Sequence, residues 1–117
     1  MEENLGTVTV SPEVLLQLVR LTTLATPGVA GLSTENPNGV HRLFNGKASQ
    51  GILLQIQDNA VSMELYVVAN PDAQLLQLGQ TLQNEISHAI QDIVGMPVRE
   101  INIHIDDVAD QVGGTPE

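Results

Sequence analysis

The sequence predicts a two-layer α+β sandwich in which two helices cover one face of a small mixed or antiparallel sheet. Two stretches repeat apolar residues every three or four positions, as helices with one buried side do, and others alternate apolar with polar residues, as half-buried strands do. Because each helix has one apolar side and the sheet has one apolar face, both helices are expected on that face. The predicted order is β-α-(β)-β-β-α-β, with a split β-α-β topology.

The first two elements are a strand over residues 6–10, where valines alternate with threonines, and a helix that starts at Ser11-Pro12-Glu13. Serine caps a first turn, proline fits the first helical position, and an acid suits the positive end of the helix dipole. Pro27-Gly28 ends the helix, and a brief edge strand follows over residues 29–32. The apolar stripe of the helix comprises Val14, Leu15, Leu18, Leu21, Thr22 and Ala25.

Residues 33–50 are predicted to form a long, mobile loop. Ser, Thr, Asn, Gly and Pro replace the periodic pattern there, and connections of this length in compact domains are often functional. Within the loop, Val40, Leu43 and Phe44 form a candidate apolar anchor that docks on the core.

A tight β-hairpin follows the loop. Residues 52–57 and 61–68 carry apolar residues at alternate positions, and Asp58-Asn59 between them tolerates the positive φ angles of a two-residue turn. The predicted outer face of the sheet carries Leu53, Tyr66 and Val68 among polar residues.

The last two elements are a long helix over residues 73–94 and a strand over residues 101–106. Asp72 is the expected N-cap of the helix, and Gly95 and Pro97 close it. The apolar stripe comprises Leu75, Leu78, Leu82, Ile86, Ala89, Ile90 and Ile93, and the final strand alternates isoleucine with polar residues.

The composition indicates one domain in a reducing compartment. The chain has 117 residues and no cysteine, starts without a basic apolar leader, and has no apolar run near the ~18 residues of a membrane span. We therefore expect a cytoplasmic protein with no direct membrane insertion. The single domain is predicted over residues 6–108, between a flexible N-terminus at 1–5 and a flexible tail at 109–117.

The charge is strongly acidic and unevenly spread. Fourteen acidic and four basic side chains give a net charge of -10, which disfavours nucleic acid and anionic lipid as partners because both draw affinity from cations. Residues 36–50 differ, since Arg42 and Lys47 give that segment a charge of +2 and leave -12 on the remainder.

Two histidine patterns are candidates for chemistry. Glu85 and His88 have the Glu-x-x-His spacing of helical metal sites, but such sites need a second copy, which the sequence lacks. His104 and Asp106 share one face of the last strand, where outward polar positions on a half-exposed strand are the preferred explanation. We predict no catalytic residue, no metal site, no cofactor and no enzyme. The alternative is a metal-dependent or acid-base enzyme using His88 or His104.

Five segments, in their order and spacing, resemble a known family. They are GTVTVSPEV at 6–14, TPGVAGL at 26–32, QGILLQI at 50–56, VSMELYVVA at 61–69 and VREINIHIDDV at 98–108. Together they are similar to the alkaline shock protein family of bacterial envelope-stress-response proteins, and the likeness covers residues 6–108. Asn70-Pro71-Asp72 departs from the family, which usually has an aromatic-glycine pair there.

The resemblance implies a non-enzymatic cytosolic protein that self-associates into a homo-oligomer. Some members are held at the inner face of the membrane by an integral-membrane partner, so a peripheral location through such an anchor protein is implied as well. No catalytic residues are known in the family, so none are carried over.

We therefore expect an interaction or scaffold module with two candidate contact regions. The +2 loop could bind an acidic partner or a neighbouring subunit's acidic surface, although a loop neutralised by its own domain explains the same residues. The candidate contact residues are Arg42, Leu43, Phe44 and Lys47 in the loop, and Leu53, Tyr66 and Val68 on the sheet.

Overall fold

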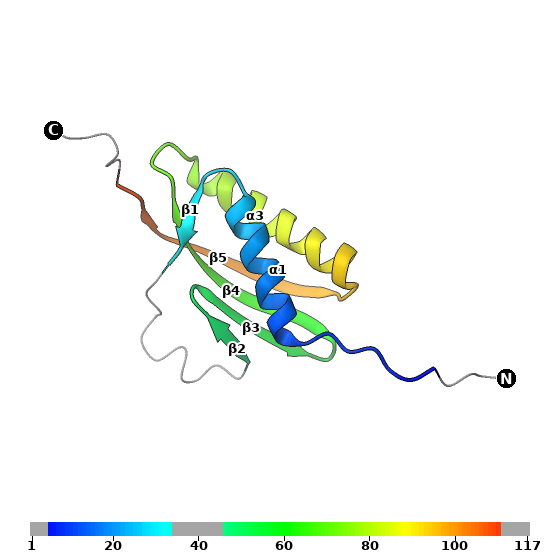
Figure 1. The fold of residues 1–117 in the computed structure, drawn as a ribbon. Coiled ribbons are helices and arrows are strands. Elements are labelled where there is room, and N and C mark those ends of the chain that lie inside the picture. Colours follow the sequence, from blue (N-terminus) through cyan, green and yellow to red (C-terminus); the bar gives the residue numbers. More distant parts are fainter. Residues whose placement is uncertain (1–4, 34–45, 111–117) are drawn as a thin grey trace.

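The computed structural model describes residues 5–33 and 46–110 and confirms the α+β fold class (Figure 1). The elements are α1 (Pro12–Ala25), β1 (Val29–Leu32), β2 (Lys47–Ser49), β3 (Ile52–Gln57), β4 (Ala60–Ala69), α3 (Leu75–Ala89), the π-helix η1 (Ile90–Val94) and β5 (Val98–Val108). No helix in the described ranges is long and apolar enough to cross a membrane.

The sheet is mixed and organised around β4. One edge of β4 pairs with β5 in parallel, and the other edge pairs antiparallel with β3 along its first part and with β1 along its last part. β2 extends the sheet beyond β3. Because β4 and β5 are direct neighbours, the predicted split β-α-β topology does not form.

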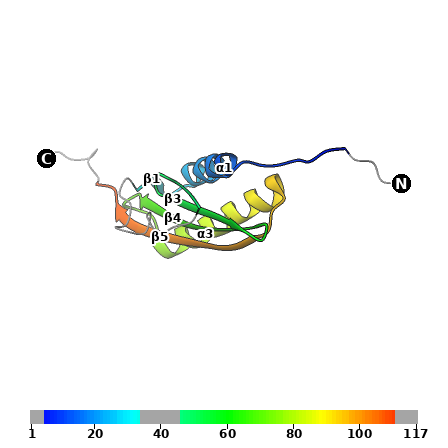
Figure 2. The same ribbon diagram turned by 90° about the horizontal axis from the view of Figure 1, so that it is seen from below.

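Both helices pack on one face of the sheet, as predicted. Leu15 and Val19 of α1 and Leu82 and Ile86 of α3 are fully buried in the same core cluster as the inner residues of the sheet. Figure 2 shows α1 lying above the strands of the sheet. Along β4, buried residues alternate with partly exposed ones over all ten positions, which gives the sheet one apolar face.

The hairpin prediction is confirmed. β3 and β4 are joined by Asp58 and Asn59, whose φ values are 54° and 63°. Positive φ at both central residues defines the type I′ turn, which matches the right-handed twist of the flanking strands.

The predicted strand over residues 6–10 is wrong. No strand forms there, and the segment leaves α1 as an extended arm that points away from the domain in both ribbon views (Figures 1 and 2). Val8 is 94% exposed and Leu5 is 88% exposed. Alternation is a local signal, whereas a strand also needs a partner edge to bond with its backbone, and residues 7–10 pair with none of the described strands.

The predicted apolar stripe of α1 is also largely wrong. The buried side is Leu15, Val19 and Thr23, and the Thr23 hydroxyl is accommodated by donating to the Val19 carbonyl at 2.7 Å. Val14 is 53% exposed and Leu21 is 52% exposed. The helix is apolar on two sides, and the sequence pattern favoured the side that the sheet does not cover.

The long helix differs from its prediction at both ends. It begins at Leu75 and has no side-chain cap, so Asp72 is not its N-cap. Its end is wound as a π-turn, closed by a 2.9 Å bond from the Gly95 N–H to the Ile90 carbonyl. The wider winding directs Val94 to the core and leaves Ile93 71% exposed, which corrects the last position of the stripe.

The predicted loop over residues 33–50 contains a strand, β2, that the sequence did not indicate. Three residues are too few to show alternation, and pairing with β3 through the turn at Gly51 defines the strand instead. Residues 34–45, which include Val40 and the other anchor residues, lie outside the described ranges. At the C-terminus, the Ala109 N–H donates to the Ala69 carbonyl at 2.8 Å, so the last described residues still follow β4.

Gly51 is predicted to tolerate substitution poorly. Its φ is +75°, and a Cβ would lie 2.9 Å from the Tyr66 carbonyl oxygen, a backbone atom that cannot move aside. Gly51→Ala should lower the free energy of unfolding by about 1–3 kcal/mol, as measured by urea denaturation. Gly31→Ala, where nothing lies within 4 Å, is the control and should change it by no more than about 0.5 kcal/mol. Equal effects would contradict this explanation.

Candidate functional site

A polar cluster forms where β4 and β5 run side by side on the outer face of the sheet. The parallel register places Glu64 beside Asn102 and Tyr66 beside His104. These side chains point away from the helices, because the intervening residues of both strands point into the core. The sequence predicted an outer face containing these residues, but not that two strands far apart in the chain would bring them together.

Glu64 is the centre of this cluster. One carboxylate oxygen lies 2.6 Å from Nε2 of His104, and the other accepts a hydrogen bond from the Asn102 amide at 2.7 Å. Tyr66 stacks on the His104 ring with centroids 4.5 Å apart and planes 13° apart. Both carboxylate oxygens are therefore engaged, and the imidazole is held on its edge and on one ring face.

The environment raises the pKa of Tyr66. Partial burial is the main cause, and the negative charges of Glu64 and Asp106 add to it, since all three disfavour a phenolate. The cluster therefore keeps a neutral phenol beside the imidazole well into the alkaline range.

The geometry supplies little for catalysis. The cluster lies on an open sheet face, and the hollows found at the described surface have other linings. A hollow of about 530 Å³ near Gly28 and Asn70 has Asp72 as the single ionisable residue in its lining. His88 lies on α3, away from this cluster. Within the described ranges, no group of three or more His, Cys, Asp or Glu side chains could hold a metal ion.

The predicted loop patch is only partly within the described ranges. Arg42, Leu43 and Phe44 fall outside them. Lys47 lies on β2, and its ammonium group is 3.2 Å from the Glu13 carboxylate at the start of α1. The backbone N–H of Glu13 itself and then Lys47 lower the pKa of that carboxyl. Lys47 is thus paired within its own domain. This agrees with the alternative given above, in which the positive charge of the loop is neutralised by the domain itself.

The predicted sheet contacts behave differently from one another. Tyr66 and Val68 are partly exposed on the outer face. Leu53 pairs with Glu64, which places it on the same face, but it is only 1% exposed. As an exposed contact residue Leu53 is therefore a wrong prediction, because a buried side chain offers no surface to a partner.

The sequence prediction missed an exposed apolar surface on the outer side of α1. Val14, Leu18 and Leu21 form this outer α1 face, with Glu13 and Gln17 at its margin and about 360 Å³ of shallow groove over it. Seven of the 14 residues of α1 are Val or Leu. This content exceeds what one buried side needs, and it is the signal from which the face could have been found.

Tyr66 offers a direct check of the polar cluster, because it is the only tyrosine and the chain has no tryptophan. An unfolded chain releases the phenol proton near pH 10, and the folded chain should release it at higher pH. The stability that this shift contributes is then complete below about pH 10 and lost as pH rises through the folded pKa. Near-ultraviolet absorbance during an alkaline titration measures the midpoint.

Glu64→Gln should lower that midpoint only in part, because burial, the larger cause, remains. Glu100→Gln is the matched control on the neighbouring strand and should leave it unchanged. A wild-type midpoint at or below that of the urea-unfolded chain would show that the described environment of Tyr66 is wrong.

Comparisons with known structures support the fold. One MamM CTD variant in a zinc form superposes with a TM-score of 0.52 at 10% identity, covering 88% of this chain and 90% of that one. A second MamM CTD variant reaches 0.53 at 9% identity, covering 92% and 93%. At such identities the likeness concerns the arrangement of helices and strands alone.

Sequence comparisons identify relatives in two bacteria. The uncharacterized protein Spy1535 of Streptococcus pyogenes is 23% identical over 125 residues, covering 98% of this chain and 88% of the relative. The uncharacterized protein YqhY of Bacillus subtilis is 24% identical over 106 residues, covering 89% and 78%.

A family model matches nearly the whole chain. It represents the alkaline shock protein family, described as having a cell envelope-related function, and the match covers residues 1–110. The resemblance seen in the five sequence segments is therefore confirmed. The chain belongs to the alkaline shock protein family.

Proposed function

We propose that this protein is a non-enzymatic, self-associating interaction module that serves the cell envelope, and that the outer α1 face binds a second copy of the chain. The observation that carries the proposal is the uncovered apolar side of α1, where Val14 and Leu21 are each more than half exposed. Apolar residues grouped on one exposed side of a helix are typical of a protein contact.

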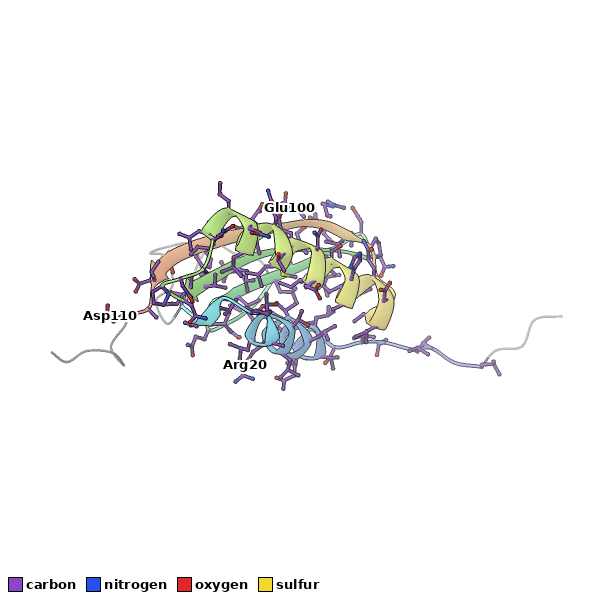
Figure 3. The ribbon with its side chains drawn as sticks, turned by 90° about the horizontal axis from the view of Figure 1, so that it is seen from above. Arg20, Glu100 and Asp110 are labelled. Atoms are coloured by element: carbon purple, nitrogen blue, oxygen red, sulfur yellow. The ribbon has the colours of Figure 1, made fainter. Side chains whose placement is uncertain are left out.

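The distribution of charge supports a second copy as the occupant. The protein carries -10 overall, so two copies repel each other over most of their surfaces. α1 is neutral, with one acid and one base, and the acid, Glu13, is already paired with Lys47. Figure 3 shows Arg20 pointing outward from α1 and Glu100 on the opposite side of the molecule. Contact through α1 therefore brings the bodies together where their repulsion is least.

The spacing on α1 also suits a two-fold contact. Val14 and Leu21 are seven residues apart, with Leu18 between them. In an antiparallel pair of identical helices centred near Leu18, Val14 of each copy faces Leu21 of the other, as an isologous interface requires. Heptad-like spacing of this kind is how helices pair along an apolar seam.

The envelope-related role of the family supports a location at the membrane. In this proposal the protein is cytoplasmic and is held at the inner face of the membrane by an integral-membrane partner. The +2 segment with Arg42 and Lys47 would bind an acidic partner or subunit, and Lys47 would then exchange Glu13 for an acid of that partner. Phe44 and Leu43 would add apolar contact beside the charges.

Two aspartates on the outer α1 face should abolish self-association. Val14→Asp with Leu21→Asp places charges in the apolar seam and should weaken dimerisation at least about tenfold, or about 1.4 kcal/mol. Both positions are exposed, so the fold and melting temperature should be retained. Light scattering over a concentration series measures the association.

Ile93→Asp is the matched control for the α1 variant, because Ile93 is at least as exposed but lies on η1. It should associate as the wild type does. A wild-type protein that stays monomeric at all concentrations, or an aspartate variant that still associates, would refute the proposal.

Charge reversal in the +2 segment gives a second prediction. If that segment binds an acidic surface of a neighbouring copy, Arg42→Glu with Lys47→Glu should reduce the mass measured by light scattering at low salt. The difference should fade in about 1 M salt, where the screening length falls to about 3 Å. Unchanged association at low salt would exclude a subunit contact and leave the acidic partner as the role of this segment.

A further inference from the structure

One long edge of the sheet is unpaired in the described structure. β5 bonds to β4 along one side, and no described strand lies along its other side. The Ile101 carbonyl points to this open edge, where it accepts a bond from the Gln83 amide of α3 at 3.1 Å. Because the backbone groups of alternate strand residues point to the same edge, those of Ile103 and Ile105 face it as well.

The open edge is regular only in its middle. β5 bulges at Arg99 and again at Asp106, where two of its residues stand against one of β4. Bulges and acidic residues are common devices that stop edge strands from pairing without limit. Between the bulges, residues 100–105 run in unbroken register. The edge therefore has room for a short strand and not for a long one.

A shallow apolar groove lies beside this regular stretch. It has a volume of about 300 Å³ and is lined by Leu75, Leu76, Gly79, Ile103 and Ile105. Leu76 is 86% exposed, and Gly79 has no side chain with which to fill the space above Ile103. A strand added to β5 would place its inward side chains against these residues.

The N-terminal arm has the complementary properties. Thr7–Val10 alternates polar with apolar residues, carries no charge and belongs to no strand of the described structure. The segment is already extended, so pairing as a strand costs it less conformational entropy. Val8 is 94% exposed and therefore accessible to a partner. These four residues fit within the six-residue stretch between the two bulges.

The arm is also on the wrong side of its own domain to reach β5. α1 begins next to β2, where Glu13 pairs with Lys47, and β2 is at the opposite edge of the sheet from β5. The helix α3 lies over β5 and α1 lies over the β2 side. A contact between the arm and β5 therefore joins different copies.

We propose that Thr7–Val10 of one copy adds as a strand to the free edge of β5 in a second copy, with Val8 and Val10 against the apolar groove beside α3. The arm forms backbone hydrogen bonds with the N–H and C=O groups of Ile103 and Ile105 at the open edge. Because the arm carries no charge, the acidic residues of β5 do not repel it. This inference rests on the proposed self-association. The contact is head to tail, so it is distinct from the two-fold contact of α1.

Disulfide trapping tests this arrangement in the full-length protein, because the natural chain has no cysteine. A Val8→Cys protein carrying a mass tag is mixed with an untagged Leu76→Cys protein and oxidised gently. Mixed disulfides should form several-fold more than with the Ile93→Cys control, since bridging requires Cβ atoms about 3.5–4.5 Å apart. A yield no higher than that control, in samples that light scattering shows to be associated, overturns the inference and leaves the proposed function standing.

Amide exchange supplies the second measurement. Val8→Pro with Thr9→Pro removes one backbone N–H donor of the arm, whether the arm pairs parallel or antiparallel to β5. In the wild type, the Ile103 and Ile105 amides should exchange more slowly at high protein concentration, and the proline variant should lose this protection. Its melting temperature should be unchanged. Val8→Ile with Thr9→Ser keeps both donors and should keep the protection. Equal protection in both variants overturns the inference, as does preferential trapping of Val8→Cys by Leu21→Cys. A protein that never associates overturns the inference and the proposed function together.

Discussion

The fold depends on the pairing of β4 on both of its edges. β4 bonds to β5 on one side and to β3 and β1 on the other. Its alternate residues Val61, Met63, Leu65 and Val67 are at most 1% exposed, and they provide the surface on which both helices pack. Removing β4 would separate every other strand except the pair β2 and β3. The close approach at Gly51 and the bond from the Ser33 N–H to the Tyr66 carbonyl both depend on the same strand.

This central strand also determines what the outer face can carry. Strict alternation sends Glu64 and Tyr66 outward, and the parallel register of β5 adds Asn102 and His104 beside them. The carboxylate and the imidazole satisfy each other at 2.6 Å, and the tyrosine covers one face of the ring. Such a satisfied network fixes the alignment of the two strands, and its open surroundings are those of a structural or contact surface. Catalytic carboxylates and imidazoles more commonly lie in a cleft that excludes water.

The sequence predictions succeeded where an element depends on residues close together in the chain, and failed where it depends on residues far apart. The hairpin needs only Asp58-Asn59 and the alternation on either side, and the second helix needs only its own apolar spacing, so both were predictable. The failed strand at residues 6–10 has a good local pattern, but residues 7–10 have no partner edge among the described strands. The side that α1 buries depends on the sheet it meets, and local spacing could not choose between Leu15 and Leu18. The Glu64 cluster required the register between β4 and β5, which no single segment encodes.

The two main failures of prediction have a common physical basis. Thr7–Val10 has the pattern of a strand, and α1 has a second apolar side. Both are surfaces suited to burial that a single copy of the domain leaves exposed. These two features are adjacent in the chain, across residues 7–21, and they lie on a neutral part of a protein whose net charge is -10. Net charge keeps such a protein dispersed, while bulges and acids restrict the open edge of β5 to a short partner. In the proposed assembly these features limit association to a few specific contacts, as a defined geometry requires, whereas unrestricted edge pairing would prevent it.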